Sequence, residues 1–402
     1  MNPKFYRKIL KNGITVILEK RSLPVVSVAF AVRCGGINES EEDKGISHFI
    51  EHMLYKGTAS RSARAIAIEI EKNGGELNGF TEEQITAYRC KMPSKHLNIA
   101  LNVLSDMVKN PLFDGKELEK ERKVIFEEIK MRHDTPNIYV MDQIQNYLYD
   151  KPFAIPLIGT YETVSRIDRK KIVDRFNKIY TPNNMILCVV GDADFNQLVD
   201  FTEKNFGNEK GKVTQFPIKL RIKEKIETRK GVDQANLIFA YHVPLATNKQ
   251  SYSAEVLNAV MALGMSSRLF AEIREKRNLA YAILGGSNAT KDFAYNLIYA
   301  GTMKENVEKV KQIILEEFKK MIKELNEKEL NQAKEQLIGN YHISMEDSQI
   351  QMINLLLEEI DGNAERFYEF EKRIKEVKLE DVKKLAEKIK PGNYSFFALV
   401  PE

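Results

Sequence analysis

Tryptophan is absent from the 402 residues, and only three cysteines and six histidines occur. Cys34, Cys90 and Cys188 are odd in number and far apart, so we expect no disulfide framework and predict buried thiols in a reducing compartment. The N-terminus has no signal-peptide core. The longest early apolar run, residues 25–32, is too short to span a membrane. These absences predict a cytoplasmic protein without a membrane partner.

An excess of charge of one sign is also missing. The 61 basic and 57 acidic side chains leave a net charge of only +4, and no basic tract is interleaved with aromatic residues. The sequence therefore predicts no nucleic-acid partner. A phosphate-binding loop is not evident either, so we expect no nucleotide cofactor. The remaining composition, 43% hydrophobic and 29% charged, is typical of a globular protein.

The order of apolar runs predicts two similar domains. A length of 402 residues is too great for one ordinary core, and the Gly- and Lys-rich stretch 205–225 reads as a linker between residues 1–210 and 225–402. Lys116-Glu117-Leu118 opens a predicted helix in the first half, and Lys328-Glu329-Leu330 opens one in the second. We predict an α+β fold in which each α/β domain has a mostly antiparallel sheet flanked by helices.

Periodicity places the main elements within this scheme. We expect strands at residues 14–18, 25–32, 85–92, 185–190, 237–243 and 294–300. We expect helices at residues 44–56, 62–72, 96–109, 114–132, 252–263 and 307–325.

Two of the six histidines lie four residues apart, in the segment His48-Phe49-Ile50-Glu51-His52. On a helix this spacing puts both imidazoles on one face, where they can reach a single zinc ion. Glu51 projects from the same face and could take a proton from a water molecule and pass it to a leaving amine. The alternative is a solvated polar face that carries two histidines by chance.

A third ligand is predicted on the helix at residues 114–132. Glu121 and Glu128 lie together at the edge of its apolar stripe, whereas Glu127 points nearly the opposite way. Carboxylates between apolar positions are costly unless they are paired, protonated or bound to a metal. Glu128 is therefore the candidate third ligand and Glu121 a supporting carboxylate. In the alternative interpretation both pair with Lys or Arg.

The His48–His52 motif, which continues as Met-Leu-Tyr-Lys-Gly-Thr58, resembles the inverted zinc-peptidase motif of the insulinase–pitrilysin (M16) family. The segment Glu121-Arg-Lys-Val-Ile-Phe-Glu-Glu128 resembles the family's second signature. The resemblance implies that His48, His52 and Glu128 bind one zinc ion per chain, with Glu51 as general base and Glu121 in a supporting role. It extends through residues 74–78, 158–160 and 180–185 and into the second half.

The sequence distance from Lys116 to Lys328, added to the residue numbers of the metal site, gives the equivalent positions in the second half. These positions predict a second half without metal. The shifted positions of His48, Glu51, His52 and Glu128 are Val260, Leu263, Gly264 and Asn340. Of these, the first three can neither bind zinc nor move a proton.

The resemblance also assigns substrate contacts. It places Arg274 and Tyr281 against the substrate and the transition state, and hydrogen bonds to a developing oxyanion would be their chemistry. It implies that a peptide adds as a strand at a sheet edge carrying Asn78 and Phe80. In the alternatives, Arg274 is one more charge on a basic helix and Asn78 is an ordinary turn residue.

The expected activity is that of a zinc endopeptidase that cleaves short, unstructured peptides inside a dimeric chamber. Long family members form a clamshell from one chain, and this chain resembles the short dimeric members, such as the subunits of mitochondrial processing peptidase. We expect each chain to be half of a clamshell, most simply in a homodimer, with a heterodimer of related subunits as the alternative. The other functions considered are processing of a leader peptide, a catalytically silent scaffold subunit and a purely structural zinc site.

Overall fold

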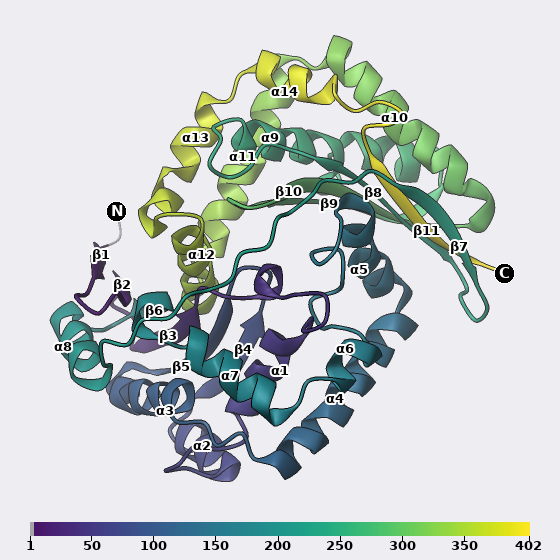
Figure 1. The fold of residues 1–402 in the computed structure, drawn as a ribbon. Coiled ribbons are helices and arrows are strands. Elements are labelled where there is room, and N and C mark those ends of the chain that lie inside the picture. Colours follow the sequence, from purple (N-terminus) through teal and green to yellow (C-terminus); the bar gives the residue numbers. More distant parts are fainter. Residues whose placement is uncertain (1–3) are drawn as a thin grey trace. The chain divides into compact units, whose positions relative to one another are not determined.

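The computed structural model describes residues 4–402, which form two compact units (Figure 1). Unit 1 comprises the residues up to 129 together with 155–217 and 344–367. Unit 2 comprises residues 130–154, 218–343 and 368–402. Each unit is built on one sheet flanked by helices, which confirms the predicted α+β class. Both units draw segments from both halves of the chain. The domain boundaries at residues 1–210 and 225–402 remain a prediction.

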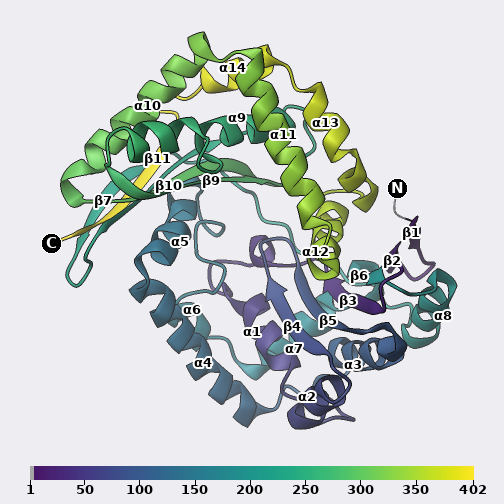
Figure 2. The same ribbon diagram turned by 180° about the vertical axis from the view of Figure 1, so that it is seen from behind.

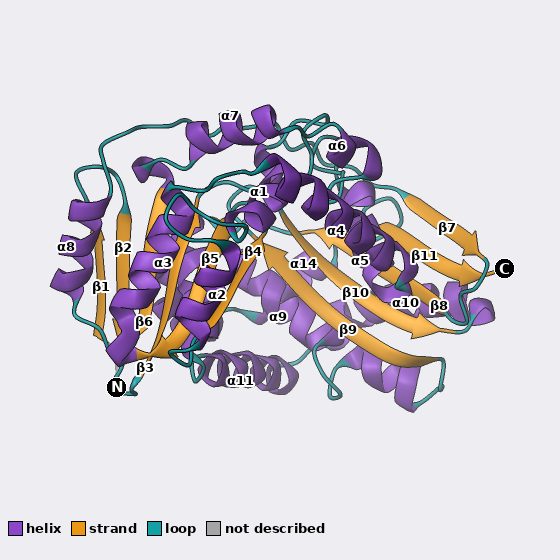
Figure 3. Ribbon diagram, turned by 90° about the horizontal axis from the view of Figure 1, so that it is seen from below, coloured by secondary structure: helices purple, strands orange, loops and turns teal. Residues whose placement is uncertain are grey.

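Unit 1 contains a six-stranded sheet, whose strands lie side by side in Figure 3. Neighbouring strands are antiparallel except for one parallel pair, β2 with β6. The strand β3 has the bounds that its apolar run predicts. In spatial order the strands are β1 (Lys4–Ile9), β2 (Thr15–Lys20), β6 (Met185–Gly191), β3 (Val25–Val32), β5 (Thr86–Pro93) and β4 (Glu76–Thr81).

The hydrophobic core of unit 1 lies between one face of this sheet and a layer of helices. The four helices expected between positions 44 and 132 are present, with ends close to the prediction, because apolar side chains recur on one face of each. Besides one helix from the second half of the sequence, described below, the helices of this unit are α1 (Ile46–Leu54), α2 (Ala63–Glu71), α3 (Leu97–Lys109), most of α4 (Gly115–Asp134), α6 (Tyr161–Ser165), α7 (Arg169–Ile179) and α8 (Phe195–Asn205).

The other face of the unit 1 sheet is covered by α12 (Ser348–Ile360), which comes from the second half of the sequence (Figure 2). Its start is fixed by a hydrogen bond of 2.9 Å between the hydroxyls of Ser27 and Ser348. Near its end, the buried carboxylate of Glu359 pairs with Arg7 at 2.7 Å and Arg33 at 2.8 Å. Two cations satisfy this buried charge, so the helix is attached by specific polar contacts as well as by packing.

Unit 2 repeats the arrangement with a five-stranded sheet. Its strands are, in spatial order, β7 (Glu224–Arg229), β11 (Ser395–Pro401), β8 (Ala235–His242), β10 (Ala294–Thr302) and β9 (Ala280–Ala289), antiparallel except for β7 with β11. Its helices from the second half of the sequence are α9 (Ser251–Ala262), α10 (Val307–Glu324), α11 (Glu327–Ser344), α13 (Phe370–Glu376) and α14 (Leu379–Ala386).

The helix α5 (Pro136–Leu148), from the first half of the sequence, belongs to unit 2. The ring of Tyr147 stacks on that of Phe397 with centroids 5.1 Å apart, which attaches α5 to β11. The helices α5 and α12 begin at positions 136 and 348, and α4 and α11 begin at 115 and 327, so both pairs share the offset that separates Lys116 from Lys328. The halves of the chain therefore exchange equivalent helices between the two units.

The assumption of one constant offset between equivalent residues of the two halves is wrong around the metal-site helix α1. The strand β3 begins at Val25 and β8 begins at Ala235, so the offset between them is smaller than that between α4 and α11. Leu263 and Gly264, the predicted counterparts of Glu51 and His52, lie beyond the end of α9. Insertions and deletions between elements explain the drift, since a single offset cannot follow loops of different length.

Packing identifies a better counterpart of Glu51 in unit 2. A Cβ atom at Gly79 of β4 would lie 3.1 Å from Glu51 Oε1, and one at Gly285 of β9 would lie 2.8 Å from Asn258 Oδ1. Asn258 therefore occupies the place that corresponds to Glu51. A neutral amide is no proton acceptor at that position. Among residues 4–402, the only group of three potential metal ligands found is the one in unit 1.

Candidate metal centre and active site

The N-terminus of α1 is held by a buried carboxylate. Glu39 accepts hydrogen bonds from the backbone N–H groups of Gly45 at 2.9 Å and Ser47 at 2.7 Å. A negative charge at the start of a helix is favourable, because the first N–H groups have no partner within the helix. Gly45 has φ of +96°, and a Cβ there would lie 2.7 Å from the carbonyl oxygen of Ile158. These contacts set the direction of the motif-bearing helix.

The faces of α1 divide largely as the sequence predicts. The apolar stripe formed by Ile46, Phe49, Ile50, Met53 and Leu54 is buried in the core of unit 1. Ser47, although polar, is buried as well, because it lies at the capped first turn beside Arg175. The remaining polar face presents the two histidines and Glu51.

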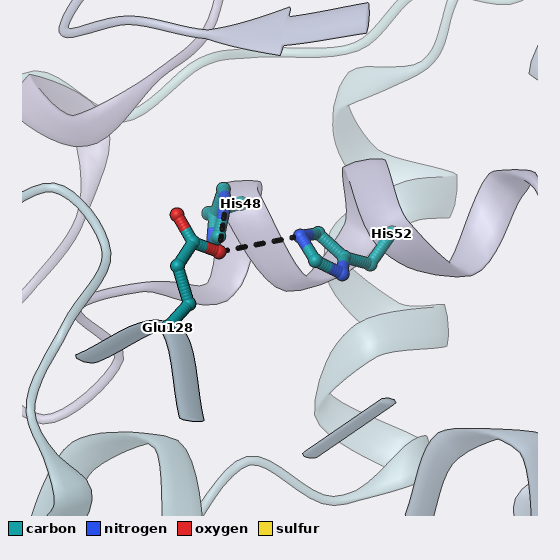
Figure 4. A group of neighbouring side chains, drawn as sticks. All are labelled: His48, His52 and Glu128. Atoms are coloured by element: carbon teal, nitrogen blue, oxygen red, sulfur yellow. Dashed lines mark ion pairs between the residues drawn. The ribbon is translucent and has the colours of Figure 1, made fainter. Parts of the chain in front are cut away.

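His48, His52 and Glu128 converge (Figure 4). One ligand atom from each lies within 4.8 Å of the others. Glu128 Oε2 is 3.7 Å from His48 Nε2 and 3.8 Å from His52 Nε2. Ligands at about 2.0–2.2 Å from a tetrahedral zinc ion are themselves about 3.3–3.6 Å apart. Two imidazoles and one carboxylate in this arrangement therefore fit zinc with small adjustments, and a three-ligand set keeps one position open for water.

Glu121 lies behind this group. Its Oε2 is 3.1 Å from His52 Nδ1, and its Oε1 is 2.6 Å from Lys56 Nζ. A carboxylate on Nδ1 favours the tautomer in which Nδ1–H donates and Nε2 is free for a metal. Glu121 therefore pairs with a lysine, as one interpretation of the sequence has it, and also lies within hydrogen-bond distance of a histidine.

Glu51 is mostly buried and accepts a hydrogen bond of 2.6 Å at its Oε2 from Thr81 Oγ1. Burial raises the pKa of Glu51, and the negative charge of Glu128 adds to this effect, against the lowering influence of Thr81 and His52. A carboxylate with a raised pKa is a better proton acceptor at neutral pH than an ordinary exposed one.

Strand β4 forms the outer edge of the unit 1 sheet next to α1. Asn78 lies inside this strand, so the alternative of a turn residue is wrong. Because side chains alternate along a strand, Asn78 and Phe80 project from the face opposite to Gly79 and Thr81. An unpaired strand edge at this place offers backbone donors and acceptors to an added peptide strand.

Arg274 and Tyr281 both lie in unit 2, whereas the other predicted site residues lie in unit 1. Arg274 is exposed on the π-helical turn η4 (Phe270–Glu275), with its guanidinium 4.9 Å from the centre of the Phe270 ring. Tyr281 is half-exposed on β9, and its ring lies against Gly301 of β10, where no Cβ would fit. Both side chains are available to a ligand.

Sequence reasoning missed three residues that contact the site. These are Thr81, whose hydroxyl binds Glu51, Lys56, which pairs with Glu121, and Tyr55, whose hydroxyl lies beside Gly79. The alternation of residues 77–81 could have placed Thr81 on the helix-facing side of its strand. The alternation alone could not name its partner, because the hydrogen bond joins residues 30 positions apart.

The chain is similar to known families over most of its length. Residues 15–161 match the model of the insulinase family (peptidase family M16), and residues 166–337 match that of the peptidase M16 inactive domain. An uncharacterized zinc protease of Bacillus subtilis is 32% identical over 401 residues, 98% of each chain. An uncharacterized zinc protease of Rickettsia felis is 32% identical over 86% of this chain and 85% of its own.

Solved structures share the fold at low sequence identity. A protease from Helicobacter pylori, 22% identical, superposes with a TM-score of 0.90 over 99% of this chain and 100% of its own. A peptidase M16 inactive domain from Pseudomonas fluorescens, 17% identical, gives a TM-score of 0.88 over 99% of this chain and 98% of its own. Within residues 4–402, no helix combines the length and the apolar composition needed to cross a membrane.

Proposed function

The chain belongs to the insulinase (peptidase M16) family, and from this membership and its site geometry we propose that it is a zinc-dependent endopeptidase. The observation that carries the proposal is the convergence of His48, His52 and Glu128 within 4.8 Å, with Glu51 on the same face of α1. The match of residues 166–337 to an inactive domain leaves out all four of these residues and includes Asn258, which stands in the place of the glutamate.

His48, His52 and Glu128 would hold the zinc ion. Bound there, zinc would polarise the carbonyl of the scissile peptide bond and make a water molecule more acidic. The donor set supports this assignment, since two imidazoles and a carboxylate are a common catalytic zinc set. Glu121 would keep His52 in the tautomer that leaves Nε2 free.

The chain's own residues would then handle the proton. Thr81 donates a hydrogen bond to Glu51 Oε2, and Oε1 is the oxygen that would accept a proton from water. The protonated carboxyl group can afterwards donate that proton to the amide nitrogen of the leaving segment. A peptide added to the edge of β4 would be held by backbone hydrogen bonds, with Asn78 and Phe80 at its side. Recognition through the backbone makes short, unstructured peptides the expected substrates.

A silent scaffold subunit is the second candidate. The inactive-domain match favours it, but a silent chain has no need for a complete ligand set with an oriented histidine. We expect the purified protein to cleave an internally quenched unstructured peptide, to lose this activity when the metal is removed by a chelator, and to regain it on addition of about one zinc ion per chain. Absence of cleavage by protein that carries one zinc ion per chain would contradict the endopeptidase assignment.

We further propose that the active form is a homodimer in which Arg274 and Tyr281 of one subunit serve the metal centre of the other. Support comes from their exposed side chains in unit 2 and from the family membership. In this arrangement a guanidinium and a phenol would hydrogen-bond the substrate carbonyl as its oxygen gains negative charge.

Mixing two inactive variants tests the shared site. Glu51→Gln and Arg274→Ala should each be inactive alone. After random subunit exchange at equal concentrations, half of the dimers are mixed and each mixed dimer has one intact site, so about a quarter of the wild-type activity should return. Subunit exchange is measured in parallel with fluorescent labels. If exchange is complete and activity does not return, the two residues act within their own chain or not at all.

A further inference from the structure

We infer that Thr81 is a positioning residue that fixes the orientation of the Glu51 carboxylate and makes its two oxygens unequal, with Oε1 as the proton acceptor. The inference rests on the proposed peptidase function of the same site. It starts from the hydrogen bond of 2.6 Å that Thr81 Oγ1 donates to Glu51 Oε2. A hydroxyl that donates to a carboxylate forms one of the stronger protein hydrogen bonds.

This bond makes the two oxygens of Glu51 unequal. A free carboxylate can turn about its last torsion and present either oxygen, because that torsion is broad. Once Oε2 is held by Thr81, the direction of Oε1 is determined by the positions of α1 and β4. A proton acceptor fixed in one direction avoids the loss of rate that comes from searching for the productive geometry.

The strand opposite Glu51 is shaped to accept this carboxylate. A Cβ at Gly79 would lie 2.4 Å from the Tyr55 hydroxyl, 2.9 Å from the carbonyl oxygen of Ala87 and 3.1 Å from Glu51 Oε1. The missing side chain at Gly79 therefore leaves the space that the Tyr55 hydroxyl and the carboxylate share. Burial raises the pKa of Tyr55, so its phenol stays neutral beside Glu51.

The position of Thr81 on β4 gives the bond a second consequence. β4 is the edge strand to which a peptide would add, and Thr81 lies three residues after Asn78 on it. The surface that receives the substrate and the group that directs the proton acceptor therefore belong to one short strand. A peptide bound along β4 is placed in a fixed relation to Oε1 of Glu51.

Thr81→Val tests the inference, because it removes the donor and keeps the shape of the side chain. We expect kcat for the quenched peptide to fall about tenfold to a hundredfold, the usual effect of losing a hydrogen bond to a charged group. KM and the zinc content should stay within about twofold of wild type, since the hydroxyl of Thr81 bonds to Glu51, which is not one of the three converging metal ligands. Thr81→Ser restores a hydroxyl and should recover most of kcat.

Thr86→Val is the matched control. Thr86 pairs with Thr81 across the β4–β5 ladder, but its hydroxyl donates to the carbonyl oxygen of Cys34 at 2.9 Å. The same chemical change there should leave kcat near the wild-type value. A Thr81→Val enzyme with wild-type kcat overturns the inference. So does one whose zinc content falls while its KM rises. The proposed peptidase function is judged separately, by the activity of the wild type and its loss in Glu51→Gln.

Stability of the metal-free protein gives an independent measure. Thr81→Val should lower the midpoint of urea unfolding in the wild-type background by more than it does in a Glu51→Ala background, where the acceptor is absent. Thr86→Val should lower the midpoint equally in both backgrounds. Equal effects of Thr81→Val in the two backgrounds would show that the hydrogen bond does not form and would overturn the inference.

Discussion

Glu51→Gln should lower peptide cleavage by at least about a thousandfold, within the range typical of lost general acid–base catalysis. The substitution keeps the size of the side chain and its ability to accept the hydrogen bond from Thr81. What it removes is the group that can bind and release a proton. Because Glu51 is not among the three converging ligands, the zinc content should remain about one ion per chain. The measurement is kcat with a quenched peptide, alongside metal analysis of the same sample.

Retention of zinc is the control that makes this result specific. If Glu51→Gln loses metal as well as activity, Glu51 acts as a ligand and the assignment of roles on α1 is wrong. If the variant keeps more than about a tenth of the wild-type kcat, another group takes the proton. Glu127, on the exposed face of α4, provides a control for the change from glutamate to glutamine, because Glu127→Gln should leave the activity unchanged.

Glu128→Gln should weaken zinc binding by more than about a hundredfold, since even the loss of a residue that only orients a ligand costs tenfold to a hundredfold. The variant replaces the only carboxylate among the three converging groups with a neutral amide. Activity should fall in parallel and return partly at high zinc concentration. The zinc dissociation constant, measured by competition with a coloured chelator, tests this directly.

Glu127→Gln is again the matched control, because it makes the same change one residue away. Glu127 is exposed and is not one of the converging ligands, so its variant should bind zinc like the wild type. Equal zinc affinities for the Glu127 and Glu128 variants would remove Glu128 from the ligand set. They would also contradict the use of helix geometry to choose between the two glutamates.

Local sequence patterns predicted the elements that carry the metal site. The apolar spacing of Ile46, Phe49, Ile50 and Met53 predicted α1, and the apolar stripe that contains Ile125 predicted the buried face of α4. These patterns work because burial on one face depends on positions three and four residues apart. The strands β1, β7, β9 and β11 were not predicted, since their runs are short or rich in charge or glycine.

Contacts between distant segments were beyond the reach of such patterns. The periodicity of α12 shows that one of its faces is apolar, but it does not show that the face covers β3 and β6 of the other half. The same limit hid the hydrogen bond of Thr81 to Glu51. A constant offset between the halves also failed at α9, because insertions between elements shift the register that the longer helices preserve.

The exchange of α5 and α12 has a consequence for the order in which the chain can fold during synthesis. The buried Glu359 on α12 pairs with Arg7 and Arg33, which leave the ribosome long before it. Until α12 emerges, the strands of unit 1 lack the cover on one of their faces. The first half of the chain must therefore wait for the second, and a ribosome that stalls near the middle of the message would hold a sheet with one side exposed.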